Sequence, residues 1–326
     1  MTGMAPRIRE RLRCPACGGG LADAAERLLC QNTACERAYP VVRGVPVLID
    51  DDTSVMRTGD YLPGSDQVVT PARQPGPRSA LRRLAARLYA RLPSVTRNVD
   101  SRENYRRFAE ALRGERDHPL VLIVGGREVG QGMDDLLAES DLEFIETDID
   151  FGERTRIVCD GHQLPFADGS VDGVVVQAVL EHVLDPILCV AEIHRVLSPR
   201  GVVYAETPFL FRRHGGPYDF TRFTFLGHRR LFRRFEEIHS GVALGPGSAM
   251  AVVYTGFLLT LTRRRAVRAL LRIFGILTSF WWKYLDPVLV RNDVSFDVAG
   301  GFAFIGRRSE SILADRDLIR GYRGLR

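Results

Sequence analysis

Glycines and carboxylates gather at the ends of short apolar runs between Val121 and Pro208. The first run, VLIV, is followed by the glycine-rich turn GGREVGQG, and the second, EFIETDID, ends in Asp148 and Asp150. A glycine-rich turn lets the backbone approach a ligand closely, and a carboxylate after the next strand can accept hydrogen bonds from two ribose hydroxyls. The order of these residues predicts a nucleoside-binding site at the carboxyl ends of parallel strands.

The glycine turn does not identify the nucleoside by itself, because a nicotinamide enzyme or a simple tight turn has similar residues. The run CDGHQLPFADGSVDGVVV separates these alternatives. It places Asp160 and Gly161 directly after a short strand and a second acid, Asp172, before the next apolar strand. We expect Asp172 to cap a turn rather than to bind a ligand.

This stretch resembles class I S-adenosylmethionine-dependent methyltransferases in the glycine loop, Asp148, the DGHQLPFADGSVDGVV run, the QAVLEHV strand end and HRVLSPRG before VVYAETP. These parts cover about ninety residues in the family's order and spacing. The resemblance implies an α/β fold with a Rossmann-like, doubly wound sheet of seven strands, and S-adenosylmethionine as cofactor. The contacts that it implies are Gly125 and Gly126 with the methionine and ribose part, Asp148 with the ribose hydroxyls, Asp160, Gly161 and His162 with the adenine, and Gln177 with the methionine portion.

One position departs from the family's pattern. Family members usually carry an acid two residues before the first glycine, where this chain has Ile123, and its glycine loop is longer than the family's GxGxG. Glu128, inside that loop, is the acid that can reach back toward the same place.

Residues for the methyl acceptor can be nominated only by position. Methyl transfer from a sulfonium is an in-line displacement, so the protein must hold donor and nucleophile in line and in some cases remove a proton. The candidates are His182 after the fourth strand, and His214, Tyr218 and Asp219 in the loop after the ETP turn. Each has a structural alternative: His182 can satisfy local backbone, and Asp219 can cap the next helix or pair with Arg222.

The loop ETPF…H..PYDFTRFT…H..LF resembles a subgroup of bacterial methyltransferases found with sugar, polysaccharide and secondary-metabolite pathways. The resemblance implies a small-molecule, sugar or carrier-linked acceptor that carries hydroxyl groups.

Four cysteines near the start of the chain form a second candidate site, with the spacing Cys14-x2-Cys17 and Cys30-x4-Cys35. Four thiolates can close a tetrahedral zinc site, which a segment this small needs because it buries little apolar area. The alternative is four unrelated buried cysteines. The segment resembles the Trm112-like zinc-ribbon domain, which precedes or partners methyltransferases. The other two cysteines, at 159 and 189, have apolar neighbours and are expected in the core.

Short apolar strands alternate with helical patterns from residue 120 onward, which favours a parallel sheet covered by helices. One helix is predicted to begin at Asp185-Pro186, a cap followed by proline in the first turn. Another is predicted over 101–113, with Ser101 as its cap. A third predicted helix carries four apolar residues on one side: Leu231, Phe232, Phe235 and Ile238.

These patterns divide the chain into three parts. They are a zinc-ribbon domain at 8–50, a linker rich in proline and glycine at 51–77, and a methyltransferase domain at 78–326. The last comprises a core at 118–240, an apolar helical insertion at 249–290 and a closing strand at 294–307, with a basic amphipathic helix over 78–92 before the core.

Composition is that of an ordinary globular protein, with 326 residues and a net charge of +5. The N-terminus has no apolar segment typical of a secretory signal. The longest apolar run, Ala249–Leu261, has 13 residues and falls short of the ~20 that span a bilayer. We therefore expect a cytoplasmic protein, with contact to a membrane surface left open by two arginine clusters, at 78–97 and 263–272.

The leading interpretation is a methyltransferase that acts on a small or carrier-linked hydroxylated acceptor. Two alternatives stay open. One is an RNA methyltransferase, since zinc-bearing rRNA methyltransferases share this layout and the basic helix can follow phosphates. The other is a scaffold that keeps the fold but has lost catalysis, which the isoleucine at position 123 motivates.

Overall fold

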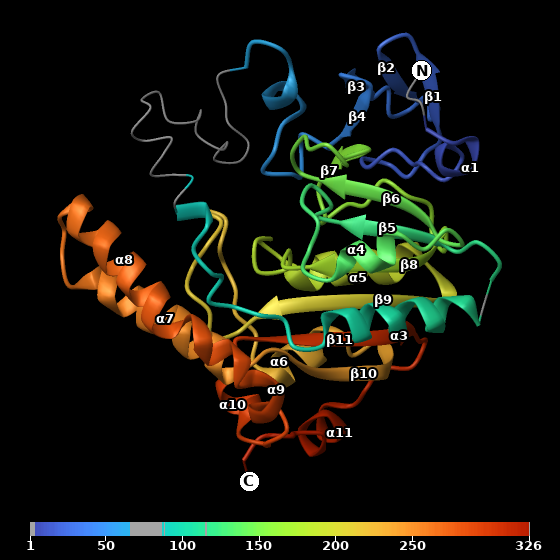
Figure 1. Cartoon of the computed structure of the whole chain (residues 1–326). Helices are drawn as coiled ribbons and strands as arrows, with labels where there is room; N and C mark the ends of the chain where they lie inside the picture. The colour runs from blue at the N-terminus through green and yellow to red at the C-terminus, as the bar shows by residue number, and fades with distance from the viewer. Residues whose placement is uncertain (1–3, 66–86, 88, 115, 326) are drawn as a thin grey trace.

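A mixed β-sheet organises the computed structural model, which describes residues 4–65, 87, 89–114 and 116–325 (Figure 1). Within these residues the sheet has eleven strands in the order β1-β2-β3-β4-β7-β6-β5-β8-β9-β11-β10. The strands are β1 (Leu21–Ala24), β2 (Arg27–Cys30), β3 (Ala38–Val42), β4 (Val45–Leu48), β5 (Leu120–Val124), β6 (Glu143–Asp148), β7 (Ile157–Cys159), β8 (Val171–Gln177), β9 (Leu197–Pro208), β10 (Phe235–Leu244) and β11 (Gly301–Arg308).

The strands from β7 to β10 follow the doubly wound pattern that the sequence predicts. Strands β7, β6, β5, β8 and β9 are parallel neighbours, and β11 is antiparallel to both β9 and β10. The carboxyl ends of the parallel strands therefore meet at one edge of the sheet, where the predicted glycine turn and acids lie.

The N-terminal unit joins this sheet, which differs from the predicted separate domain beside a seven-stranded sheet. Strands β1 to β4 form an antiparallel meander, and β4 pairs in parallel with β7, with Val47 opposite Val158. A short helix, α1 (Pro6–Arg9), precedes the meander. Because main-chain hydrogen bonds join β4 to β7, the N-terminal meander and the strands from β5 to β11 share one continuous sheet.

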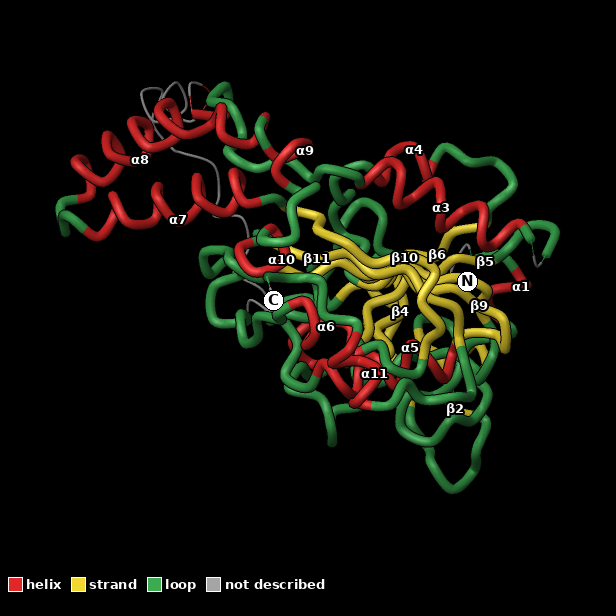
Figure 2. Tube along the Cα trace, turned by 90° about the horizontal axis from the view of Figure 1, so that it is seen from below, coloured by secondary structure: helices red, strands yellow, loops and turns green. Residues whose placement is uncertain are grey.

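Helices cover both faces of the sheet (Figure 2). On one side α3 (Ser101–Arg113) and α4 (Met133–Leu137) pack Tyr105, Phe108 and Leu112 of α3 against buried strand residues. On the other side lie α5 (Pro186–Val196), α6 (Phe225–Leu231) and α11 (Asp315–Arg320). Cys159 and Cys189 are both buried in the core of this second side, as predicted.

The sequence predicts Asp185 and Ser101 as helix caps, and the structure confirms only Asp185. Asp185 caps α5, accepting hydrogen bonds from the backbone N–H groups of Ile187 and Leu188 at 3.0 Å each. In α3 the cap position belongs to Asp100, which makes no side-chain cap bond, and Ser101 is the first helical residue.

The predicted helix that carries Leu231, Phe232, Phe235 and Ile238 on one side is wrong beyond Leu231. Helix α6 ends there, and Phe235 begins β10. The spacing of these residues suits a helix, but pairing of β10 with β11 supplies a long ladder that fixes the extended form. Non-local pairing of this kind overrides local periodicity.

The predicted linker also differs from the structure where it is described. Residues 51–65 include the short helix η1 (Thr58–Tyr61) and bury Met56 and Tyr61. The Tyr61 hydroxyl donates a hydrogen bond of 2.7 Å to the carbonyl of Ile149, after β6. This part of the segment thus packs onto the sheet edge, whereas most of the predicted 78–92 helix lies outside the described residues.

The apolar insertion is helical, as expected, and extends away from the sheet (Figures 1 and 2). It consists of α7 (Pro246–Thr260), α8 (Arg265–Ser279), η2 (Phe280–Tyr284) and α9 (Asp286–Leu289), followed by α10 (Ser295–Val298). Buried Asp286 anchors its base by accepting hydrogen bonds from Gly247 and Ser248. Among the described residues, no helix has both the length and the apolar character needed to cross a membrane.

Candidate functional site

A cavity of about 510 Å³ lies at the carboxyl ends of β5, β6, β7 and β8. It brings together residues from the glycine turn, the two acidic turns and the loop after β9. Eight of the eleven residues predicted for cofactor and acceptor line it: Gly125, Asp148, Asp160, Gly161, His162, His182, His214 and Tyr218.

Asp148 stands at the end of β6, where its side chain is held by backbone donors. Its two oxygens accept hydrogen bonds from the N–H groups of Arg127 at 3.1 Å and Asp150 at 3.0 Å. Burial raises the pKa of the Asp148 carboxyl above its usual value, against these hydrogen bonds. Each oxygen has a second lone pair, so the carboxylate can still accept hydrogen bonds from a vicinal diol.

Asp160 follows β7 and forms a fixed pair with His162. Oδ1 accepts hydrogen bonds from His162 Nδ1 at 2.6 Å and from the His162 backbone N–H at 3.0 Å, and the Ser54 hydroxyl donates to Oδ2 at 2.5 Å. Although burial opposes it, the hydrogen bonds from His162 and Ser54 lower the pKa of Asp160. Asp160 in turn raises the pKa of His162, whose Nε2 accepts from the Asp185 backbone.

The two predicted glycines have different roles. Gly125 lines the cavity with φ of +79°, and a Cβ there would collide with Val179. Gly126 does not line the cavity; a Cβ on it would lie 2.8 Å from the Cβ of Glu146. Glycine at position 126 therefore lets the turn pack closely on β6, and it does not contact the cavity.

Gln177 differs from its predicted role. Strand alternation directs its side chain to the α3 side of the sheet, where its Oε1 accepts from the Tyr105 hydroxyl at 2.9 Å. Its Nε2 donates to Glu206 at 2.7 Å. The amide is thus part of a buried polar network, and the next residue, Ala178, lines the cavity instead.

Three residues that line the cavity are not among the site residues predicted from the sequence. Val55 and Met56, in the predicted linker, line the cavity next to Ser54, which bonds to Asp160. Two apolar residues inside a polar stretch are a faint signal, and nothing in their spacing points to a cofactor. Glu128 also lines the cavity, with a side chain that is 85% exposed. Ile123, which stands where family members usually carry an acid, is buried in the core.

Asp172 has a structural role, but it lies within β8 and does not cap a turn as predicted. Its carboxylate is buried, accepts a hydrogen bond of 3.0 Å from the Leu120 backbone and pairs with Arg116 at 3.2 Å.

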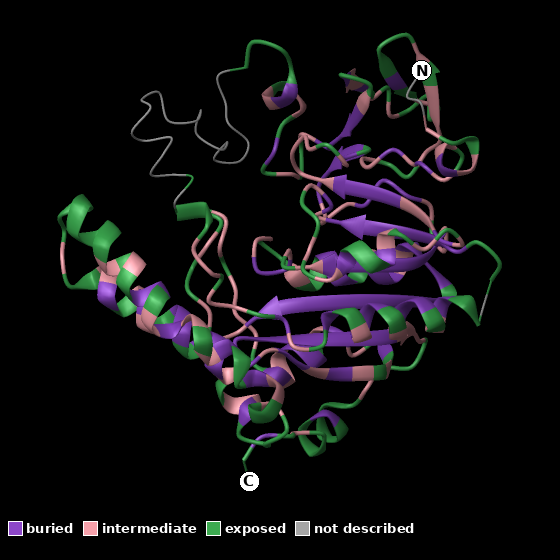
Figure 3. Ribbon diagram, in the orientation of Figure 1, coloured by how far each residue is buried: buried purple, intermediate pink, exposed green. Residues whose placement is uncertain are grey.

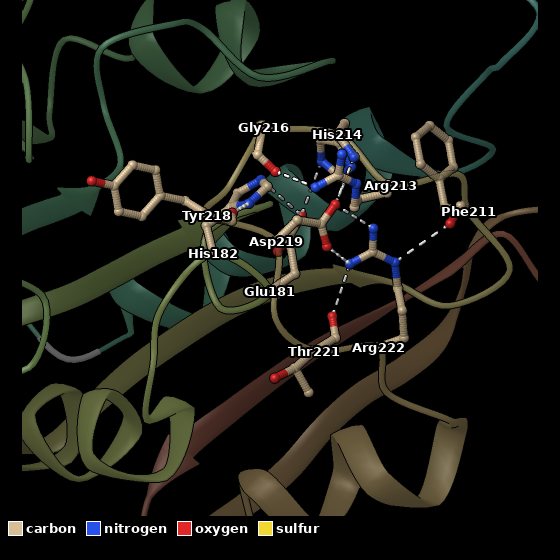
Figure 4. A network of polar contacts seen from close by, with 10 residues as sticks. All are labelled: Glu181, His182, Phe211, Arg213, His214, Gly216, Tyr218, Asp219, Thr221 and Arg222. Atoms are coloured by element: carbon tan, nitrogen blue, oxygen red, sulfur yellow. Dashed lines mark hydrogen bonds and ion pairs between the residues drawn. The ribbon is translucent and has the colours of Figure 1, made fainter. Parts of the chain in front are cut away.

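Four polar residues meet beside the cavity, and two of them, His182 and His214, line it (Figure 4). Glu181 and His182 come from the turn after β8, and His214 and Asp219 from the loop after β9. The His182 and His214 rings are edge to face, with centroids 4.7 Å apart. Tyr218 contributes its carbonyl, which accepts from His182 Nδ1, and its ring points away from both imidazoles.

Asp219 positions the loop rather than facing the cavity. It accepts the His214 backbone N–H at 2.6 Å and forms two bonds with the Arg222 guanidinium, at 2.5 and 2.8 Å. Although burial opposes it, Arg222 holds the pKa of Asp219 below its usual value. The predicted alternative, pairing of Asp219 with Arg222, is therefore the arrangement observed.

The four N-terminal cysteines converge, with their sulfur atoms all within 4.8 Å of one another. The Sγ atoms of Cys14 and Cys35 are 3.8 Å apart and those of Cys17 and Cys30 are 3.5 Å apart. Zinc–sulfur bonds of about 2.3 Å in a tetrahedron place sulfurs about 3.8 Å from each other. A backbone hydrogen bond from Gly19 lowers the pKa of Cys17 to about 7, whereas burial raises the pKa of Cys30 and of Cys35.

Comparison with known proteins gives a match to a methyltransferase domain over part of the chain. Residues 137–205 match a family model described as a methyltransferase domain. This match covers β6 to most of β9, including both acidic turns. No curated protein matches the chain at a significant level.

Similar solved structures are distant. A [4+2]-cyclase, SpnF, is 16% identical, with a TM-score of 0.37, over 64% of this chain and 82% of the other. A complex of the Haloferax volcanii Trm112 methyltransferase activator with a candidate methyltransferase is 16% identical, with a TM-score of 0.36, over 64% and 92%. A Burkholderia thailandensis 1,6-didemethyltoxoflavin N1-methyltransferase with bound S-adenosylhomocysteine is 14% identical, with a TM-score of 0.39, over 69% and 83%. At these identities and TM-scores none of them assigns a substrate to this chain.

Proposed function

We propose that the chain transfers the methyl group of S-adenosylmethionine to a hydroxyl group of a small-molecule, sugar or carrier-linked acceptor. The observation that supports this proposal is the single cavity that combines Asp148 and Asp160 with His182 and His214. The first pair suits a nucleoside and the second pair suits a proton-bearing acceptor.

The cofactor supplies an electrophilic methyl group on a sulfonium, so the protein needs chiefly to bind and orient both partners. In the proposal, Asp148 accepts hydrogen bonds from the ribose hydroxyls and the backbone at Gly125 lies against the sugar and methionine part. The pair of Asp160 and His162, with Gly161, meets the adenine, while Val55 and Met56 cover it from the N-terminal segment. His182 and His214 then face the acceptor and hold its hydroxyl group in line with the methyl group.

Calorimetry with S-adenosylmethionine and S-adenosylhomocysteine tests the cofactor assignment. We expect both to bind, and Asp148→Asn to weaken binding roughly tenfold or more, since hydrogen bonds to a charged group contribute about 1.5–3 kcal/mol. Asp168→Asn is the matched control, because that carboxylate is 81% exposed and outside the cavity. If neither S-adenosylmethionine nor S-adenosylhomocysteine binds, the proposal is rejected.

The two alternatives are separated by the next assay. Methyl transfer to total RNA, with none to sugar-containing extracts, would support an RNA methyltransferase instead. Tight binding of the cofactor without transfer to any fraction would support the non-catalytic scaffold, which the isoleucine at position 123 motivates.

We also propose that Cys14, Cys17, Cys30 and Cys35 hold a structural zinc ion. The converging sulfurs and the close approach of Gly19, whose Cβ would lie 3.1 Å from the sulfur of Cys30, support this. Metal analysis should find zinc bound by these cysteines, and a stable protein without metal would contradict the assignment.

Finally, we propose that the helical insertion contacts an anionic membrane surface. Residues 246–285 contain five arginines and one lysine, with no aspartate or glutamate. Large apolar side chains are nevertheless exposed along α8, η2 and α9 at helical spacing: Leu270, Phe274, Leu277, Trp281, Tyr284 and Val288. A soluble protein rarely exposes so continuous an apolar stripe, and basic residues beside it favour anionic lipid.

A further inference from the structure

Glu181 is a buried carboxylate without a hydrogen-bond donor. Its side chain is 0% exposed, and neither oxygen has a hydrogen-bond partner within the described residues. A buried charge that lacks compensation is costly to maintain. The environment of Glu181 therefore indicates a missing cationic partner.

Two imidazoles direct a ring nitrogen toward this carboxylate. Nε2 of His214 lies 3.4 Å from Glu181 Oε1, and Nε2 of His182 lies 3.7 Å from the same oxygen. These separations are too long for good hydrogen bonds but match neighbouring ligands of one ion. The three donor atoms all lie within 4.8 Å of one another.

The opposite nitrogen of each ring faces a second polar group, and only that of His182 is hydrogen-bonded within the described residues. Nδ1 of His182 donates to the Tyr218 carbonyl, which leaves Nε2 of His182 as the acceptor atom. Nδ1 of His214 faces Asp219 Oδ2 at 3.6 Å. Histidines that bind metals usually present the other ring nitrogen to a carbonyl or carboxylate in this way.

The glycine at position 215 makes this arrangement possible. Gly215 has φ of +75°, and a Cβ there would lie 2.6 Å from Cε1 of His182. Only glycine lets the loop after β9 close over the His182 ring and bring His214 beside Glu181.

We infer that Glu181, His182 and His214 bind a divalent transition-metal ion on the acceptor side of the cavity. Two neutral imidazoles and one carboxylate suit ions such as Zn²⁺, Fe²⁺ and Co²⁺ and leave coordination positions open. The ion would supply the positive charge that Glu181 lacks. His182 and His214 also line the large cavity, so an open position faces the space available to the acceptor.

The consequence for catalysis rests on the proposed function. A hydroxyl group bound to such an ion loses its proton more readily. That proton passes to water, the oxygen attacks the sulfonium methyl, and the carbon–sulfur bond breaks as the carbon–oxygen bond forms. S-adenosylhomocysteine is the leaving group.

Cobalt titration of the full chain, purified with zinc on its four cysteines, tests the inference directly. We expect one further equivalent of Co²⁺ to bind, with visible absorption typical of nitrogen and oxygen ligands and without the strong thiolate bands that would mark exchange at the cysteines. Glu181→Gln and His214→Ala should weaken this binding at least tenfold. His118→Asn is the matched control, since that histidine is exposed and outside the cavity.

Binding of S-adenosylhomocysteine, measured on the same samples, shows that each variant is folded and separates this inference from the proposed function. Cofactor binding without Co²⁺ binding would overturn the metal site and leave the methyltransferase proposal standing. Co²⁺ binding that is equal in wild type and both variants would overturn it as well. Co²⁺ binding without cofactor binding would support the site and contradict the proposed function.

Discussion

At the scale of single residues, His228 of α6 shows how burial creates a pH dependence far from the cavity. The ring is 2% exposed and packs against the rings of Phe232 and Phe304, with centroids 5.3 and 6.5 Å away. Nε2 has no hydrogen-bond partner within the described residues. Burial lowers the pKa of His228 to about 3.

This shift predicts an acid-labile fold. Between pH 6.5 and 3 the unfolded chain binds a proton at this position and the folded chain does not, so stability falls as pH decreases through that window. The slope is about 1.4 kcal/mol per pH unit, or about 2–3 kcal/mol between pH 7.5 and 4.5. In His228→Phe this part of the loss should disappear, as measured by urea unfolding at the two pH values.

His118→Asn serves as the control, because an exposed histidine should leave the pH dependence unchanged. An identical loss of stability in wild type and His228→Phe would show that another group causes the acid sensitivity.

The site residues that sequence predicted best are acids at strand ends. Asp148 and Asp160 follow short apolar strands, and the geometry of a parallel sheet places them at one edge. Gln177 was misplaced because its position on the strand, rather than its residue type, decides which face its amide reaches. Val55 and Met56 were missed because their place depends on a long-range contact that local pattern does not encode.

At the scale of elements, the N-terminal meander contributes directly to the cavity. Strand β4 pairs with β7, and the segment after β4 brings Ser54 to Asp160 and Met56 to the cavity wall. The sequence predicted the cysteine cluster but not this connection, because a two-residue parallel pairing leaves no periodic signal. The continuous sheet implies that the proposed zinc site steadies the proposed cofactor pocket.

Removal of the zinc should therefore weaken cofactor binding. Chelation, or Cys17→Ser, is expected to loosen β1 to β4 and to release Ser54 from Asp160. The affinity for S-adenosylhomocysteine should then fall roughly tenfold, because one charge-assisted hydrogen bond and the apolar contacts beside it are lost. Calorimetry before and after chelation measures the change, and restored affinity on returning zinc is the control. An unchanged affinity in metal-free protein would show that the cysteine cluster is independent of the pocket.

At the scale of the whole molecule, the helical insertion and the cavity share one edge of the sheet. Helix α7 begins directly after β10 and, with α8, extends beyond the carboxyl ends of the parallel strands (Figure 1). Figure 3 shows that much of α8 is exposed along its length. A membrane bound by this hairpin would lie near the edge of the sheet that holds the cavity. A second copy is disfavoured as the partner, because two hairpins with only positive charge repel each other.

Vesicle flotation tests the membrane contact. The full chain should bind vesicles that contain anionic phospholipid, and more weakly as salt is raised, because each arginine near such a surface contributes about 1 kcal/mol. The triple variant Arg264→Gln, Arg268→Gln and Arg272→Gln should then lose about 3 kcal/mol, roughly a hundredfold in affinity at low salt. Phe274→Ser with Trp281→Ser should also weaken binding, because it removes apolar area that enters the lipid boundary.

Ile319→Ser is the matched control for the apolar variant, since this residue of α11 is 65% exposed and lies outside the insertion. Wild-type binding that is equal on neutral and anionic vesicles would contradict the role of the arginines. A concentration-dependent dimer that Phe274→Ser and Trp281→Ser abolish, without any vesicle binding, would instead identify the stripe as an interface between copies of the chain. Binding to RNA that the triple arginine variant loses and the apolar variant keeps would assign the positive charge to nucleic acid, because phosphate contacts do not require an exposed stripe of leucine, phenylalanine and tryptophan.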